Sequence, residues 1–390
     1  MAKKFIFSLL VFLLFSCKGH KDQPPIKKDY KALGDATVDV FKNAPVVFDT
    51  KAVPDGYHDP DANGIIRLVN GRLILKKLEL PKYERNVSVK LKARLVSNGD
   101  PYDRSGSIFI LNNSKKGVSQ IGVAKGGQYP VMEGELGKYP GIIRLEDYEP
   151  CVEAMRFMTP FGVGHFSNYP TPAGIDKWEE DVKWECDITH LYPLLEGDAY
   201  LGCWIDTWVK EGFLIDVQLE ITESKENKPM EKYKVLPLIN TCPYIGQNYP
   251  DVFYHYKDGI KVKAKLNAKT EAKLYYIVTG HGGNNGDEFH KKENIISVNN
   301  NEIKKFTPWI ESCKAYRKWN PTSGDVGGGL SSSDLNRSNW CPGSIVLPEV
   351  ISLEEKNIEN GIFSFAIQKA SKSVGNNLNF WLVSSYVVYK

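Results

Sequence analysis

Three acidic residues lie in segments whose neighbours favour β-strands. Asp103, in D-P-Y-D-R, leads into an apolar stretch, and Asp206 lies between two tryptophans in C-W-I-D-T-W. Glu288 follows the glycine-rich run T-G-H-G-G-N-N-G and precedes a second apolar stretch. Acidic residues are depleted in strands, and an ionised carboxylate pressed against aromatic rings is costly. Because environments that perturb a carboxyl group are typical of hydrolytic sites, we predict that these three acids meet in one.

The local pattern alone leaves alternatives open for two of these acids. Strand alternation places Trp204, Asp206 and Trp208 on one sheet face, where the aromatic rings would raise the pKa of the carboxyl group by desolvation. The alternative is a solvated aspartate on an open face between surface tryptophans. For Asp103 and Arg104, a carboxylate and a guanidinium just before a strand, the local pattern favours a surface ion pair over catalysis.

Other chemistries find weaker support. The glycine-rich run lacks the G-x-x-x-x-G-K-[ST] arrangement of a phosphate cradle. His281, Asp287 and His290 could form a two-histidine, one-carboxylate metal centre, but no H-x-H occurs, and Lys291 and Lys292 add positive charge there. No G-x-S-x-G is present. We therefore expect acid chemistry without a metal.

The composition is that of a globular protein with an ordinary charge balance. The chain has 390 residues, 42% hydrophobic and 25% charged, which is enough for two domains. A net charge of +3 is not the strongly basic charge typical of nucleic-acid-binding proteins, so we expect no nucleic-acid partner. Eight Trp and twenty Tyr favour β-structure and suit stacking on sugar rings.

The N-terminus predicts export and lipidation. Two lysines precede the apolar run 5–15, which is too short to span a bilayer as a helix. The run ends in L-F-S-C, which resembles a bacterial lipobox, so cleavage before Cys17 and its acylation are expected. The prediction is an exported lipoprotein at the outer membrane or cell surface, with the periplasmic face as another possibility. Ordinary secretion, with Ser16 as the small residue, is the alternative.

Six further cysteines remain in this exported, disulfide-permissive chain. They could pair in fifteen ways, and no C-x-x-C occurs, which argues against a structural zinc site. These cysteines are Cys151, Cys186, Cys203, Cys242, Cys313 and Cys341.

Short alternating segments separated by Gly, Asn, Pro and Asp clusters predict an all-β sandwich or barrel. We expect strands at 65–68, 72–75, 87–96, 107–111, 200–208, 213–221, 261–266, 272–278, 295–298, 362–368 and 379–389.

Composition shifts predict the domain organisation. Residues 18–43 are expected to form a flexible tether, since they are rich in Lys and sparse in apolar residues. A charged run with a proline, 226–232, is the expected linker between domains at 44–225 and 233–390. Within the first domain, 113–149 reads as a long insertion without periodicity.

Five motifs together resemble the bacterial peptide-N-glycosidase F family, and they occur in the family's order. D-P-Y-D-R looks like the family's D-x-W-D-R, and R-F-M-T-P-F its R-F-I-T-P-Y. C-W-I-D-T-W is similar to x-Y-T-E-T-W, and R-S-N-W-C-P-G to R-x-x-W-C-P-G. The fifth match is G-D-E-F-H-K-K-E-N-I-I-S-V-N-N.

This resemblance implies an all-β fold of two antiparallel eight-stranded jelly-roll β-sandwich domains packed side by side. The site would lie in the cleft between them. The implied activity is hydrolysis of the amide bond between an asparagine side chain and N-acetylglucosamine, without metal or cofactor. N-linked glycoproteins or glycopeptides would be the partners, and the protein would be a monomer.

The resemblance also assigns roles to residues. Asp103 would be the principal catalytic acid, with Glu288 and Asp206 as supporting carboxylates, and Cys313 and Cys341 would form a disulfide. The residues implied to bind substrate or brace the cleft are Tyr102, Arg104, Trp208, His281, Arg337 and Trp340.

Departures from the family pattern predict the same bond but a different glycan preference. Asp206 is one methylene shorter than the family's Glu, and a shift of about 1 Å at a reacting centre can cost on the order of a hundredfold. Tyr102 replaces a Trp, and His281 is offset by one position. Two cysteine pairs are missing, with Gly286 and His290 in place of one of them.

Three other functions stay open from the sequence. One is a carbohydrate-binding lipoprotein that has lost turnover. The second is a glycosidase that uses two carboxylates. The third is a copper or iron oxygenase on paired jelly rolls.

Overall fold

The computed structural model describes residues 29–111, 118–132, 134–283, 286–327, 329–354 and 357–390. The predicted signal peptide with Cys17, the first part of the predicted tether and residues 112–117 lie outside the described residues. None of the helices found in these ranges has the length and apolar character needed to cross a membrane.

The first half of the chain folds into a sandwich of two antiparallel sheets. A four-stranded sheet has the order β1-β9-β4-β7, and a six-stranded sheet the order β17-β6-β5-β8-β3-β2. The strands are β1 (Ala36–Val46), β2 (Ile65–Leu68), β3 (Leu73–Leu80), β4 (Val87–Ser97), β5 (Ser105–Leu111), β6 (Val152–Met158), β7 (Val182–Asp187), β8 (Gly197–Ile205), β9 (Phe213–Glu223) and, from the second half, β17 (Ile345–Val346).

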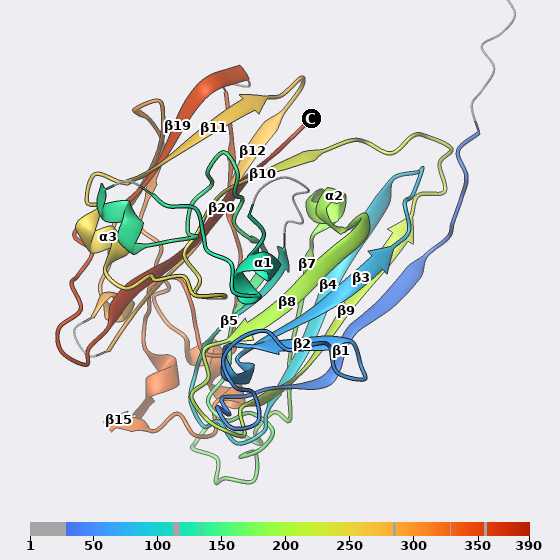
Figure 1. Ribbon diagram of the computed structural model, residues 1–390. Coiled ribbons are helices and arrows are strands. Elements are labelled where there is room, and N and C mark those ends of the chain that lie inside the picture. Colours follow the sequence, from blue (N-terminus) through green and yellow to red (C-terminus); the bar gives the residue numbers. More distant parts are fainter. Residues whose placement is uncertain (1–28, 112–117, 133, 284–285, 328, 355–356) are drawn as a thin grey trace, which may run out of the picture.

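The second half forms another antiparallel sandwich, beside the first (Figure 1). Its two four-stranded sheets have the orders β10-β20-β12-β18 and β11-β19-β13-β14, and β15 pairs with β16. The strands are β10 (Lys234–Asn240), β11 (Ile260–Asn267), β12 (Ala272–Gly282), β13 (Asn294–Val298), β14 (Asn301–Phe306), β15 (Asp325–Gly327), β16 (Leu330–Ser331), β18 (Glu349–Ser352), β19 (Asn357–Ile367) and β20 (Asn379–Tyr389). The expectation of two β-sandwich domains is confirmed.

The helices of the described chain are short. The α-helices are α1 (Gln120–Ala124), α2 (Tyr192–Leu195) and α3 (Val252–His255). The 3-10 helices are η1 (Val69–Gly71), η2 (Gly134–Lys138), η3 (Thr189–Leu191), η4 (Asp287–Phe289), η5 (Lys314–Trp319) and η6 (Ser332–Asp334).

The six-stranded sheet is buried on both faces, which explains why β5 reads as a continuous buried run. One face contributes Ile108 and Ile110 to the core of the first sandwich. The other face carries Phe109, which stacks on Tyr244 of the second half at a centroid distance of 3.9 Å. The second half thereby covers the sheet whose interior strand β5 begins two residues after Asp103.

Two sequence expectations need correction. The predicted tether, 18–43, extends too far, because β1 begins at Ala36 and pairs with β9 while Phe41 is buried in the first core. The strand predicted at 200–208 ends at Ile205, so Asp206 lies just beyond β8. Its backbone N–H still donates to the carbonyl of Ser105, at 2.9 Å, which keeps it beside β5.

The described part of the predicted insertion 113–149 packs onto both sandwiches. Ile121 and Val123 pack against the cluster that contains Phe109 of β5. Tyr139 and Ile142 belong to the second hydrophobic core. The backbone of Asn240 donates to Ile142 at 2.7 Å, and that of Arg144 donates to Leu238 at 2.8 Å. The insertion therefore extends the β10 edge and ties the two halves together.

A buried arginine on β6 also joins the sandwiches. Arg156 donates to both carboxylate oxygens of Glu153, at 2.9 and 2.6 Å, and both side chains are excluded from solvent. The same guanidinium donates across the junction to Thr279 Oγ1 at 3.1 Å and to the carbonyl of Leu382 at 2.5 Å.

The segment before β1 is fastened to the first sandwich by backbone hydrogen bonds. The N–H groups of Leu33 and Gly34 donate to one carboxylate oxygen of Glu223, at 2.8 and 2.6 Å. Glu223 is the last residue of β9, so the chain enters the fold at that end of the strand.

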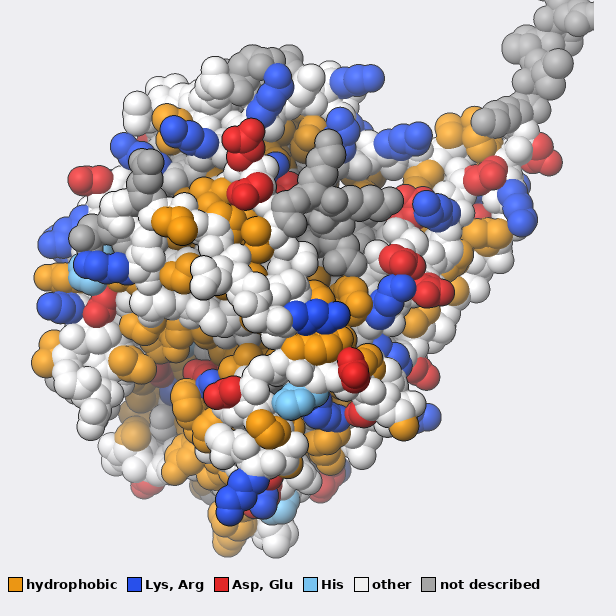
Figure 2. All heavy atoms as spheres, viewed as in Figure 1, with side chains coloured by type: hydrophobic (Ala, Val, Ile, Leu, Met, Phe, Trp, Pro, Cys, Tyr) orange, Lys and Arg blue, Asp and Glu red, His pale blue; other side chains and the backbone are white. Residues whose placement is uncertain are grey.

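On the face drawn in Figure 2, basic and acidic side chains are interspersed, in line with the small net charge.

Candidate active site

Two of the three predicted acids meet on one arginine between the sandwiches. Asp103 lies on the turn before β5, and Glu288 lies in η4, after β12. Arg337 Nε donates to Glu288 Oε1 at 2.9 Å, and its Nη2 lies 3.7 Å from Asp103 Oδ2. Both carboxyl groups are partly buried, and the arginine side chain is only 1% exposed. The structure thus brings together residues 185 positions apart, from 103 to 288.

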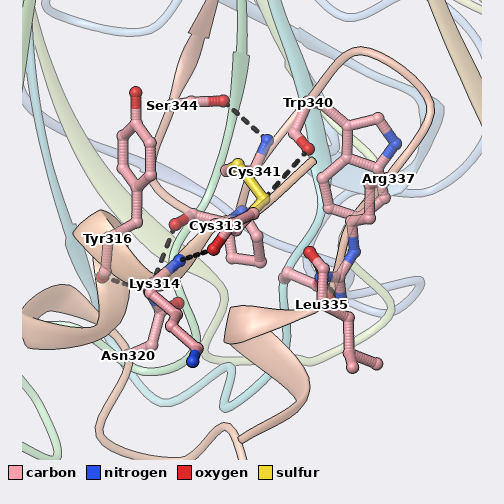
Figure 3. Close-up of a disulfide and its surroundings, with 12 residues drawn as sticks. Cys313, Lys314, Tyr316, Asn320, Leu335, Arg337, Trp340, Cys341 and Ser344 are labelled. Atoms are coloured by element: carbon pink, nitrogen blue, oxygen red, sulfur yellow. Dashed lines mark hydrogen bonds and ion pairs between the residues drawn. A yellow bond between two sulfur atoms is a disulfide. The ribbon is translucent and has the colours of Figure 1, made fainter. Parts of the chain in front are cut away.

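Contacts with residues of the second half hold the side chain of Arg337 in place. Its Nη1 donates to the carbonyl of Ser332 at 2.8 Å, and its guanidinium lies 4.7 Å from the ring centroid of Trp340. Both Arg337 and Trp340 belong to the segment closed by the disulfide between Cys313 and Cys341 (Figure 3). The resemblance implied that Arg337 binds substrate or braces the cleft. Its side chain is 1% exposed, and its donors contact the two acids and the backbone.

The surroundings perturb both acids in the same direction. Burial raises the pKa of Glu288 to about 7, with Arg337 acting against the shift and Asp103 adding to it. Burial also raises the pKa of Asp103, while Arg337 and Arg104 oppose that rise. Two neighbouring carboxyl groups of this kind titrate as a pair, so one can hold a proton while the other is ionised. The pair therefore combines an acid and a base near neutral pH.

Arg104 stabilises the turn that carries Asp103. The sequence pattern favoured an ion pair between Arg104 and Asp103, but in the structure Arg104 pairs with another acid. Its Nε donates to Asp100 Oδ2 at 2.9 Å, so Arg104 pairs with Asp100 rather than with Asp103. Asp100 is fully buried and also accepts from Thr207 Oγ1 at 2.7 Å and from the backbone of Tyr102 at 3.0 Å. The motif D-P-Y-D-R includes Asp100, but the sequence did not predict that this residue anchors the turn.

The third predicted acid, Asp206, forms an ion pair with a different arginine, Arg72. Arg72, which follows η1, places Nη1 3.2 Å from Asp206 Oδ1. Burial raises the pKa of Asp206, whereas Arg72 and then Arg104 lower it. Asp206 therefore lies at the edge of the Asp103 turn, in a separate ion pair. Nothing in the sequence marked Arg72.

The predicted substrate-binding aromatics fall into two groups. Tyr102 and Trp208 are 54% and 55% exposed, so a ligand can reach them. Tyr102 directly precedes Asp103, and Trp208 lies beside Arg72 and Asp206. His281 and Trp340 are buried behind the acids, with their ring centroids 5.5 Å apart. Burial lowers the pKa of His281 to about 3, so the ring stays neutral and braces the site from behind.

The acidic residue next to Glu288 serves packing. Asp287 is fully buried and accepts from Trp381 Nε1 and from the backbone of Ser371, both at 2.8 Å. Among the residues that the structure describes, no group of three or more His, Cys, Asp or Glu side chains is arranged to hold a metal. The described cysteines other than Cys313 and Cys341 are free thiols, namely Cys151, Cys186, Cys203 and Cys242.

Comparison with known protein families matches most of the chain. Residues 37–221 match the family model "Peptide-N-glycosidase F, N terminal", and residues 248–388 match "Peptide-N-glycosidase F, C terminal". A curated relative, peptide-N(4)-(N-acetyl-beta-D-glucosaminyl)asparagine amidase F of Elizabethkingia miricola, is 24% identical over 251 residues, covering 61% of this chain and 64% of the relative.

Solved structures agree with these matches. The structure of PNGF-II in space group P21 is 35% identical, with a TM-score of 0.82 over 91% of this chain and 65% of that chain. PNGase F, a glycosylasparaginase from Flavobacterium meningosepticum, shares the fold at 17% identity, with a TM-score of 0.59 over 91% of this chain and 96% of that chain. The chain spans just under two thirds of the length of the curated relative and of PNGF-II.

Proposed function

The chain belongs to the peptide-N-glycosidase F family, and from that premise we propose that it is an amidase acting on N-linked glycans. The bond cleaved is the amide between an asparagine side chain and N-acetylglucosamine. N-linked glycoproteins or glycopeptides are the substrates.

The observation that carries this proposal is the pair Asp103 and Glu288 on one buried arginine, Arg337. Hydrolysis of an amide needs one group to take a proton from water and one to give a proton to the departing nitrogen. A pair with raised pKa values can supply both at neutral pH. The water oxygen bonds to the amide carbon, the carbon–nitrogen bond breaks, and the products are an aspartate and a glycosylamine.

Arg337 positions the two acids in this scheme. Its guanidinium keeps both carboxyl groups within reach of one substrate atom, and the disulfide-closed segment limits its movement. A positioned group can contribute several orders of magnitude in rate, so we expect loss of Arg337 to impair turnover through the acids.

The test is mass spectrometry of a defined N-glycopeptide after incubation in heavy-oxygen water. The expected product peptide carries Asp in place of the glycosylated Asn, with one heavy oxygen in its side chain. Asp103→Asn should abolish this conversion. Asp198→Asn, which changes an exposed acid paired with Lys77 at the other end of β8, is the matched control and should retain it. Full activity of Asp103→Asn would refute the assignment.

The same experiment separates the competing functions. The exposed rings of Tyr102 and Trp208 beside the acids also suit a carbohydrate-binding protein without turnover. Such a protein would bind the glycopeptide and leave its mass unchanged. A glycosidase would instead shorten the glycan and leave a sugar on the asparagine.

We further propose that the protein is an exported monomer anchored through lipid on Cys17. The lipobox-like L-F-S-C after a short apolar run supports this placement at the outer membrane or cell surface. Metabolic labelling with a radioactive fatty acid should mark the wild-type protein and leave Cys17→Ala unlabelled. Recovery of an unlabelled wild-type protein from the culture medium would contradict the anchor.

A further inference from the structure

The hairpin of β15 and β16 begins and ends next to residues that contact the candidate active site. Before β15, Thr322 Oγ1 donates to the carbonyl of Pro101, in the turn that carries Asp103. After β16, the carbonyl of Ser332 accepts from Arg337 Nη1 at 2.8 Å. Both ends of the hairpin are thus attached to groups that hold the acids. Figure 1 shows β15 on the outer side of the second half.

Polar contacts hold the base of the hairpin in place. Arg317 forms an ion pair with the buried Asp334, and Asp334 Oδ2 also accepts from the backbone N–H of Ser331 at 2.9 Å. The hydroxyl groups of Ser323 and Ser331 are hydrogen-bonded to each other. The Ser323 hydroxyl also accepts from the backbone N–H of Ser333, at 2.8 Å. Because an isolated two-stranded hairpin is marginally stable by itself, this base is what holds the strands.

The strands themselves are exposed and carry apolar side chains. All three residues of β15 are exposed, and Val326 and Leu330 are 53% and 38% exposed. Neither of these two side chains belongs to a hydrophobic core of the described chain. The fold therefore holds a hairpin that adds little to its own packing.

The edge of β15 is open to another strand. Among the strands in the described ranges, β15 and β16 pair only with each other. Exposed edges are normally protected by lysine or proline, and neither strand contains one. The backbone N–H of Gly327 donates to the exposed side chain of Asp325 at 2.7 Å, a local contact that an incoming strand can replace.

The proposed substrate must bring a polypeptide close to this edge. The amide carbon of an asparagine side chain is two bonds from its Cα, about 2.5 Å away, so the substrate backbone lies beside the acids. Leu330 is two residues from Ser332, so their Cα atoms are at most about 7 Å apart. An extended polypeptide advances about 3.3 Å per residue, so residues about two to four positions from the asparagine can reach the hairpin.

We propose that the edge of β15 binds the polypeptide of the substrate as an added strand, while Val326 and Leu330 contact its apolar side chains. This inference rests on the proposed function and deepens it, since it assigns a surface to the polypeptide rather than to the glycan. Strand addition recognises the backbone, which every polypeptide has, so the surface would accept many sequences. A strand of three residues forms few hydrogen bonds, which suits a product that must be released.

The experiment measures binding by calorimetry in an Asp103→Asn background, where turnover does not interfere. Two probes carry the same N-acetylglucosamine disaccharide on one asparagine. One is a tripeptide, and the other extends it by about four residues on each side. The parent should bind the long probe more tightly than the tripeptide.

Val326→Ser combined with Leu330→Ser should weaken binding of the long probe about fivefold, because apolar contact is lost at both side chains. Binding of the tripeptide should stay unchanged. Val350→Ser is the matched control, since Val350 lies in β18 and is 50% exposed, and it should bind both probes normally.

A second set of probes tests the backbone contact without changing the protein. In an added strand, alternate N–H groups of the peptide face the hairpin and the others face away. N-methylation of one alternate set of amides in the long probe should weaken binding about threefold to tenfold, and methylation of the other set should have little effect.

Three outcomes would overturn the inference. The parent could bind both probes equally, the double variant could bind the long probe normally, or the two methylated sets could have equal effects. The proposed function fails differently, since a wild-type protein that binds the probes without converting Asn to Asp would refute amidase activity. The binding comparison would still decide whether the hairpin takes the polypeptide.

Discussion

Glu288→Gln should stabilise the fold at alkaline pH, and this prediction follows from the pKa of the carboxyl group. Burial raises that pKa from its ordinary 4.5 to about 7. Since the folded state holds the proton more tightly than the unfolded state, Glu288 contributes stability that is fully present below pH 4.5. That contribution is lost as the pH rises through 7.

The magnitude follows from the same two values. A rise in pKa from 4.5 to about 7 corresponds to about 3 kcal/mol in the free energy of unfolding. Glutamine resembles the protonated acid and does not titrate. The stability of Glu288→Gln relative to the wild type should therefore increase by about 3 kcal/mol between pH 4.5 and pH 8.

Urea unfolding at pH 5 and at pH 8 is the assay, with Asp198→Asn as the control whose difference from the wild type stays nearly constant. A Glu288→Gln difference that is the same at both values would refute the reasoning, whatever its sign. The variant should also lose amidase activity, because the proposed acid–base pair is broken. More stability with less activity would mark Glu288 as a group kept at a cost to the fold.

Three more predictions concern the junction between the sandwiches and the disulfide. Arg156→Met leaves Glu153 charged and buried without its cation, so unfolding in urea should require about 3–5 kcal/mol less, and adding Glu153→Gln should restore much of the loss; an unchanged midpoint for Arg156→Met would contradict it. Burial lowers the pKa of His190 to about 4 from 6.5, so the stability of the wild type relative to His190→Phe should fall by up to about 3 kcal/mol as the pH drops from 6.5 to 4 in the same assay, because the titration of Glu288 is common to both proteins. Replacing Cys313 and Cys341 by serine opens a loop of sequence separation 28, which should cost about 3 kcal/mol and lower glycopeptide turnover; full turnover would show that Arg337 needs no such support.

The sequence identified the acids but not everything that holds them. Asp103 and Glu288 could be found because acidic residues beside apolar strands are unusual, and Arg337 because it opens a motif. Arg72 follows a glycine in a turn, and its partner lies 134 positions away, so no local pattern marks it. Asp100 stands between a glycine and a proline, where an aspartate is normally interpreted as a turn residue. The sequence therefore offered no reason to expect that it anchors the turn through Arg104.

The same limit applies to the fold. Alternating segments predicted eleven of the twenty strands that the structure describes, and β6, β7 and β10 are among those missed. Strands with one buried face, such as β4, β9 and β11, show their period directly. The strand β1 was missed, and its residues up to 43 were assigned to the tether, since its A-T-V-D-V-F-K-N-A-P-V mixes polar residues and a proline and its register with β9 shifts twice. The insertion has no period, so its attachment to the β10 edge depends on tertiary contacts that a linear pattern does not carry.

The attachment of Leu33 and Gly34 to Glu223 has a consequence for an anchored protein. Phe213 and Glu223 are the two ends of β9. The proposed catalytic acids lie toward the Phe213 end, where the backbone of Asp100 donates to the carbonyl of Gly212, so roughly 30 Å of strand separates them from the point where Leu33 and Gly34 are attached. If Cys17 is acylated as proposed, fifteen residues lie between it and Leu33, which gives a contour length of at most about 55 Å. The proposed catalytic acids would then lie at the end of the first sandwich opposite the point where the anchored chain enters it.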